Sequence, residues 1–198
     1  MCNFKSIMAA VTLSTLATAS FATEAVRGWT VDPAMSSVAF GSIKNDYAGE
    51  THRFSDVTGT VDQKGNVAIT VGLASLETMI DIRNERMAEF VFQNAPSTQI
   101  TAELDMAALA ALPVGDATTL ETYGTLNLLG TDTELDATFF VMRLSADKVL
   151  VTSDGMIMLA TEDTAFDAGI DKLQELASLD GITRVSPVTL RLVFDADM

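Results

Sequence analysis

The segment Val185-Ser-Pro-Val-Thr-Leu-Arg-Leu-Val-Phe194 alternates two sets of side chains, so that Val188, Leu190 and Leu192 share one face. The segment Trp29-Thr-Val-Asp-Pro-Ala-Met-Ser-Ser-Val-Ala-Phe40, near the start of the chain, alternates in the same way. A period of two residues is typical of β-strands. Both segments are therefore predicted to be strands, and together they resemble the two ends of one closed antiparallel β-barrel.

Further runs with a period of two lie between these ends, for example over residues 67–74 and 135–142. Turn-forming residues separate the runs at 63–66, 130–132 and 146–148. The chain is predicted to hold about eight strands, which is the number found in a barrel or a sandwich. The predicted fold class is therefore all-β.

Several of these strands are apolar or small on both faces, as in residues 38–41 and 156–159. An open antiparallel sheet with one face in water should alternate more cleanly. Apolar residues on both faces fit a barrel in which one face lines an apolar interior and helices cover the other. A tightly filled sandwich core is the alternative.

Two short helices are predicted to interrupt the strands. Thr78 begins the first, and Asp81 follows it at the spacing of a capping box. The second runs from about Thr164 to Ala177, where Thr164 and Asp167 have the same spacing. Its apolar residues recur at helical spacing, which predicts that one side packs against the barrel.

The first 22 residues have the layout of a secretory signal peptide. Lys5 is the only charge in this segment, an apolar run covers residues 7–19, and Ser20 and Ala22 offer small side chains before a cleavage site. Residues 1–22 are therefore predicted to be removed, leaving one domain over 23–198. The prediction is a secreted, periplasmic protein, with an uncleaved anchor as the alternative.

The charge and the cysteine content exclude several function classes. A formal net charge of −15 repels nucleic acid and anionic headgroups, so we expect no nucleic-acid partner and no stable membrane anchor. Cys2 is the only cysteine, so a disulfide framework is not expected. It precedes the apolar run, whereas a lipoprotein signal would place it afterwards. The sequence leaves the oligomeric state open, a homodimer included.

The sequence offers little for catalysis or for metal binding. His52 is the only histidine, so no Ser-His-Asp or Cys-His arrangement can be built without it, and a single histidine cannot supply an ordinary zinc site. We expect His52 to be a polar residue at the barrel rim. No EF-hand-like loop is present, so no metal and no cofactor are predicted. Carboxylate pairs such as Glu162 and Asp163 would suit a hydrolase, but a solvated acidic surface explains them better. The chain is predicted not to be an enzyme.

Arg83 and Arg86 lie one turn apart on the first predicted helix of an otherwise acidic chain. Arginine binds phosphate or carboxylate groups through two parallel hydrogen bonds. The pair could therefore receive the headgroup of a ligand. Ion pairing with neighbours such as Asp81, Glu85 and Glu89 is the alternative, and we favour it.

Four motifs, taken in order, resemble those of the YceI family of secreted, lipocalin-like lipid-binding proteins. The matching positions are Trp29, Val31, Asp32, Ser36, Val38 and Phe40; Phe54, Val57 and Gly59; Ser75, Thr78, Arg83, Asn84 and Met87; and Gly124, Leu126, Leu128 and Gly130. Met35 stands where the family usually has histidine, and Asn84 where aspartate is commoner. The resemblance covers nearly all of the chain after residue 22.

The resemblance implies an eight-stranded antiparallel, lipocalin-like β-barrel that holds an isoprenoid lipid or a quinone in an apolar cavity. Strand faces then select the cavity residues, which are predicted to be Phe40, Phe54, Phe90, Phe139, Val141, Met156, Met158 and Leu192. Arg83 and Arg86 are the candidate headgroup contacts. The alternative function is a structural or interaction module whose barrel core is filled by its own side chains.

Overall fold

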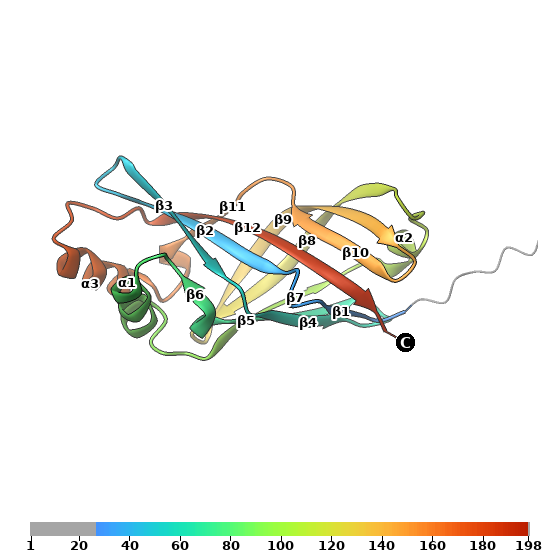
Figure 1. Ribbon diagram of the computed structural model, residues 1–198, viewed down its shortest axis with the longest axis horizontal. Coiled ribbons are helices and arrows are strands. Elements are labelled where there is room, and N and C mark those ends of the chain that lie inside the picture. The colour runs from blue at the N-terminus through green and yellow to red at the C-terminus, as the bar shows by residue number, and fades with distance from the viewer. Residues whose placement is uncertain (1–26, 198) are drawn as a thin grey trace, which may run out of the picture.

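Twelve antiparallel strands make up most of the computed structural model, which describes residues 27–197 (Figure 1). The predicted signal peptide, its cleavage after Ala22, and Cys2 lie outside the described residues. The strands are β1 (Trp29–Val31), β2 (Ser37–Lys44), β3 (Ala48–Phe54), β4 (Val57–Val61), β5 (Asn66–Gly72), β6 (Leu76–Glu77), β7 (Ser97–Glu103), β8 (Ala117–Leu128), β9 (Thr131–Ser145), β10 (Lys148–Ser153), β11 (Ile157–Ala160) and β12 (Val185–Ala196).

Eight of these strands form a closed ring. The order is β1, β4, β5, β7, β8, β9, β10 and β12, and the ring closes because β1 pairs with both β4 and β12. In the closing register Trp29 lies opposite Ala196 and Val31 lies opposite Phe194. The two end segments of the sequence therefore do meet, and the predicted eight-stranded barrel is confirmed.

Strands β2 and β3 extend the barrel beyond this ring. The outer part of β12 pairs with β2, which continues the path of β1, and β2 forms a hairpin with β3. On its far side β3 pairs only with the two residues of β6. Since no longer strand covers that side of β3, the helices that follow β6 in the chain complete the wall there (Figure 1).

The predicted turns are present and have clear local causes. Between β4 and β5, the Asp62 carboxylate accepts hydrogen bonds from the backbone N–H groups of Lys64 (2.8 Å) and Asn66 (2.9 Å). Gly65 in the same turn has a φ of +93°, which favours glycine. The segments around Gly130 and Asp147 join β8 to β9 and β9 to β10.

Helices occupy both ends of the barrel (Figure 1). At one end lie α1 (Asp81–Arg86), the π-helical turn η2 (Met87–Val91) and α3 (Asp167–Ala177). At the other end lies α2 (Met106–Ala110). The chain also has two short 3₁₀ turns, η1 (Leu73–Ser75) and η3 (Thr161–Asp163). Within residues 27–197 no helix combines the length and the apolar character needed to cross a membrane.

The two predicted capping boxes are wrong, although both helices exist. Helix α1 starts at Asp81, and the Thr78 hydroxyl donates to the Ile80 carbonyl instead of capping the helix. Helix α3 starts at Asp167, and the Thr164 hydroxyl donates to the Thr161 carbonyl (2.8 Å) and accepts from the Phe166 N–H (3.3 Å), both before the helix. In both places the predicted capping residue stabilises the loop before the helix rather than its first turn.

The helix α2 was not predicted. Asp105 caps it by accepting a hydrogen bond from Ala107 N–H (2.9 Å), and Arg143 on β9 holds the segment that follows. The Arg143 guanidinium donates to the carbonyl groups of Leu112 (3.2 Å) and Ala146 (3.3 Å). This buried side chain therefore ties the connection between β7 and β8 to the end of the barrel.

Helix α3 packs closely on η2 at Gly169. A Cβ atom at this position would overlap the Phe90 carbonyl oxygen and would lie 2.7 Å from the Val91 Cα. The backbones approach each other here because glycine has no side chain, and this contact holds α3 against the helical part of the wall.

Replacing Gly169 with alanine tests this contact, because two effects have opposite signs. Helix propensity alone would make Gly169→Ala stabilising by about 1 kcal/mol. Overlap with the backbone of η2 should instead lower the free energy of unfolding by about 1–3 kcal/mol, as overpacking does. Urea unfolding measures the sign. Ala168→Gly, on the exposed side of the same helix, is the control and should cost about 1 kcal/mol from propensity alone.

Candidate ligand cavity

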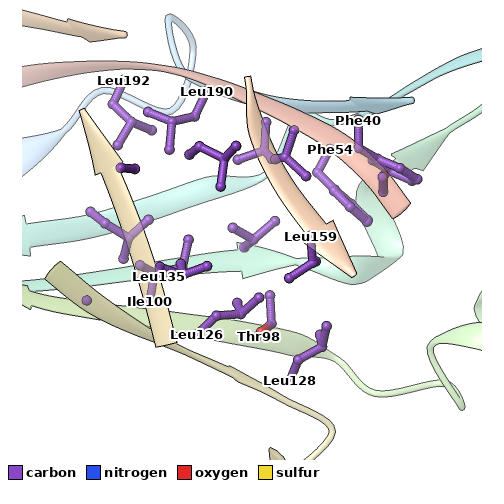
Figure 2. Close-up of a pocket in the computed structure, with 18 of the residues that line it drawn as sticks. Phe40, Phe54, Thr98, Ile100, Leu126, Leu128, Leu135, Leu159, Leu190 and Leu192 are labelled. Carbon is purple, nitrogen blue, oxygen red and sulfur yellow. The ribbon is translucent and has the colours of Figure 1, made fainter. Parts of the chain in front are cut away.

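A continuous cavity of about 630 Å³ occupies the inside of the barrel. Figure 2 shows side chains from several strands that point into it, among them Phe40, Ile100, Leu135, Leu159 and Leu190. The walls are overwhelmingly apolar. A volume of this size lies within the range of about 300–1,000 Å³ that is typical of ligand pockets.

Five of the eight predicted cavity residues line this cavity. They are Phe40, Phe54, Phe139, Val141 and Leu192. Phe40, Phe139, Val141 and Leu192 lie on strand faces that the alternation of apolar residues predicted, and the same faces also contribute Val38, Leu135 and Leu190. The strand faces of the barrel can therefore be assigned from the sequence, at least where the strands are long.

The other three predicted cavity residues do not line the cavity. Met156 is 69% exposed and Met158 is 60% exposed, whereas Ile157 and Leu159 between and beside them face inward. The short strand β11 is apolar on both faces, so the pattern could not distinguish inside from outside. Phe90 lies in the π-helical turn η2, from which Met87 and Val91 point into the cavity in its place.

A row of aromatic rings joins the barrel wall to the helices. The ring of Phe40 stacks on Phe54 at 5.4 Å between centroids, Phe54 meets Phe92 edge-on at 5.5 Å, and Phe92 meets Phe166 edge-on at 5.4 Å. All four rings line the cavity. Edge-on and offset contacts of this kind are favourable beyond the area that they bury, so the row fixes the helical part of the wall.

The two arginines both lie at the cavity wall, near the α1 end, but they differ in their contacts. Arg83 forms an ion pair with Glu50 and donates from Nη2 to the Thr78 carbonyl at 2.6 Å. The expected ion pairing of Arg83 is therefore present, but its partner is on β3 and is none of the acidic residues of its own helix. Arg86 forms no ion pair with any residue from 27 to 197.

Glu50 is the centre of a small charged cluster at this end. Its carboxylate also accepts from the Lys44 ammonium at 2.8 Å. Burial alone would raise the pKa of Glu50, but the hydrogen bonds and charges of Lys44 and Arg83 outweigh it and lower the pKa below its ordinary value. Glu50 therefore stays ionised and links β2, β3 and α1 across the gap beside β3.

His52 is not at the rim, as its position in the sequence suggested, but in the cavity wall. It is only 2% exposed and lies against Phe40 at 5.0 Å between ring centroids. Its Nε2 is 3.0 Å from the Ser42 hydroxyl. Burial, and to a smaller extent the charge of Arg83, lowers the pKa of His52 below its ordinary value, so the ring is uncharged at neutral pH.

Ser42, Lys44, Glu50 and the inward position of His52 were not predicted, although a signal was present. Ser42 and Lys44 continue the inward face of β2 that holds Val38 and Phe40, and His52 precedes Phe54 by two residues on β3. An inward strand face that changes from apolar to polar residues marks the polar end of a cavity.

The cavity reaches the surface beside α1. Ile80 and Ile82 both line it, and yet they are 45% and 51% exposed. Residues that contact the cavity and the solvent at once mark a mouth. Among residues 27–197, no group of three or more His, Cys, Asp or Glu side chains is arranged to hold a metal ion. Glu162 and Asp163, the carboxylate pair considered for hydrolysis, lie exposed on η3.

The size of the cavity argues against a barrel filled by its own side chains. Protein cores are close-packed and hold few voids larger than a water molecule. The space of about 630 Å³ inside this barrel is far larger than such voids. A cavity of this volume with apolar walls is therefore best explained as the binding site of an apolar molecule.

A closed antiparallel barrel of eight strands around one apolar cavity is the lipocalin-like architecture. Residues 29–186 match the family model described as the YceI-like domain. The chain therefore belongs to the YceI-like family.

Two solved structures show the same fold. A polyisoprenoid binding domain from Saccharophagus degradans, implicated in plant cell wall breakdown, is 33% identical and has a TM-score of 0.83; the match covers 85% of this chain and 98% of that one. BcnA of Burkholderia cenocepacia is 13% identical with a TM-score of 0.59, over 82% of this chain and 98% of that one, and this likeness concerns the fold alone. Comparison with curated protein sequences finds no match.

The buried His52 should make stability depend on pH. The unfolded chain takes up a proton at His52 below a pH of about 6.5, but the folded protein resists it because the pKa is lowered. Stability from this residue is therefore present above that pH and is lost as the pH falls. Between pH 7 and pH 5 the wild type should lose more thermal stability than His52→Gln. Equal losses would show that the ring is protonated without cost.

Proposed function

We propose that this protein is a secreted, non-enzymatic carrier that holds the polyisoprenoid chain of a lipid or a quinone inside its barrel. The observation that carries this proposal is the continuous apolar cavity of about 630 Å³. The 33% identical domain from Saccharophagus degradans, whose name describes it as polyisoprenoid binding, supports the same ligand class.

The shape and lining of the cavity suit an isoprenoid chain. The cavity extends from Trp29 and Leu109 near the α2 end to Ile82 and Leu173 near the α1 end, so it is long rather than round. An isoprenoid tail is long, branched and almost insoluble in water, and its burial is driven by the hydrophobic effect. At roughly 0.3 kcal/mol per heavy atom, a tail of about 40 carbons could reach about 12 kcal/mol, which is close to nanomolar affinity.

Two further features support transport outside the cytoplasm without catalysis. Residues 1–22 have the layout of a secretory signal peptide, so we propose a periplasmic location. The polar groups of the cavity include the buried, uncharged His52, the Ser42 hydroxyl beside its Nε2 and a charged cluster centred on Glu50. No carboxylate among residues 27–197 orients the His52 ring from Nδ1, as the base of a nucleophile–base pair would require. This set of groups can orient a bound molecule, and we propose that it performs no chemistry.

Native mass spectrometry of the protein purified from its own host tests the ligand class. We expect an added mass that organic solvent releases as an isoprenoid lipid or quinone. If the protein carries no added mass and also fails to bind isoprenoids supplied in detergent, the proposed function is wrong.

Blocking the cavity should abolish binding without unfolding the barrel. Val141 on β9 faces the cavity, so Val141→Trp should fit into the existing space and change the free energy of unfolding by less than about 1 kcal/mol, whereas a filled core would lose about 1–3 kcal/mol. Isoprenoid binding should weaken at least about tenfold because the new ring takes the place of the tail. Met158→Trp, on the exposed face of β11, is the matched control and should change neither property.

A further inference from the structure

The polar end of the cavity contains hydrogen-bonding atoms that have no partner among residues 27–197. His52 Nδ1 and Arg83 Nε are both buried and unpaired. Both side chains line the cavity, and each affects the other electrostatically, since Arg83 contributes to the lowered pKa of His52. Buried polar groups are nearly always hydrogen-bonded, so two unpaired atoms on side chains that line one cavity indicate a place for a polar atom of a ligand.

The remaining atoms of the two side chains are already committed. The guanidinium of Arg83 uses Nη1 for Glu50 and Nη2 for the Thr78 carbonyl, which leaves Nε–H as its free donor on this side. His52 uses Nε2 for Ser42, which leaves Nδ1. These contacts hold both side chains in place before a ligand arrives, and such preorganisation lowers the cost of binding.

We propose that His52 and Arg83 form a recognition site for one uncharged oxygen of the lipid head, a carbonyl or a hydroxyl group, and that this site does not accept a phosphate. This inference rests on the proposed function, because it concerns the head of the same bound molecule. A carbonyl oxygen can accept from Arg83 Nε–H and from His52 when Nδ1 carries the proton. A hydroxyl group can accept from Arg83 and donate to His52 in the other tautomer.

The cations around the site are largely engaged by Glu50, which leaves few groups free to receive a phosphate. The Glu50 carboxylate lies between Lys44 and Arg83 and engages the hydrogen-bonding ends of both cations. His52 stays uncharged because it is buried, so it offers no positive charge of its own. Arg86 is the only further cation that lines this end of the described structure, and one unpaired arginine cannot match a diphosphate in a largely apolar cavity.

Four probes with the same tail of four isoprene units test the inference in the full chain. They are menaquinone-4, geranylgeraniol, geranylgeranyl diphosphate and the corresponding hydrocarbon without a head. Trp29 is the only tryptophan and lines the cavity, so its fluorescence reports occupancy for every probe. We expect the quinone or the alcohol to bind about tenfold more tightly than the hydrocarbon, the factor that one to two good hydrogen bonds supply, and the diphosphate to gain nothing.

Two variants locate the preference. His52→Phe replaces the ring by an apolar one of similar size and should abolish the tenfold preference while the hydrocarbon binds as before. Thr122→Val is the matched control, because the Thr122 hydroxyl is the other unpaired buried atom that lines the cavity, and it lies on β8 away from the charged cluster. This variant should keep the full preference.

The outcomes separate this inference from the function that it refines. Equal binding of all four probes by the wild type, or tighter binding of the diphosphate, would overturn the recognition site and leave the carrier function intact. Failure of every probe, the hydrocarbon included, would overturn the carrier function itself. If His52→Phe does not fold, the affinities of the four probes for the wild type and for Thr122→Val still test the recognition site. Loss of the preference in Thr122→Val would place the site at the middle of β8 and overturn the inference.

Discussion

The pairing of β1 with both β4 and β12 is the constraint on which the rest of the structure depends. It joins residues 29–31 to residues 194–196, close to the two ends of the described chain, and removes the free edges of the ring. Each remaining strand must then present one face to the inside. Since the ring has eight strands, its interior is wide enough to hold a small ligand, as in lipocalins. The cavity therefore follows from the closure.

Beyond the ring, ion pairs join β3 to its neighbours where strand pairing is absent. Strand β3 has only β6 on its far side, and the wall is completed by α1 and η2. Glu50 on β3 meets Arg83 on α1 and Lys44 on β2, and the row of rings from Phe40 to Phe166 joins the same elements. The polar end of the cavity is thus also the place where helices and strands are fastened, so recognition and wall integrity share residues.

The sequence predicted the parts that depend on local pattern and failed where tertiary context decides. Long strands such as β9 and β12 gave the correct inward face for Phe139 and Leu192, because alternation over many residues leaves one assignment. The prediction that Met158 lines the cavity was wrong, because a four-residue strand with two apolar faces can turn either face inward. His52 was placed at the rim although its spacing of two residues from Phe54 predicts the same inward face. How deeply it is buried depends on the register of β3 against β2, which the local pattern does not give.

The apolar walls supply the affinity for a ligand, and the polar end selects between ligands. Contacts along the walls are numerous and similar for every isoprenoid chain, so they supply affinity without distinguishing one head from another. A buried hydrogen-bonding pair contributes little for a correct partner but penalises a molecule that leaves its atoms unpaired. A carrier that must release its cargo benefits from this arrangement, because selection then comes from rejecting wrong heads and does not require tighter binding of the right one.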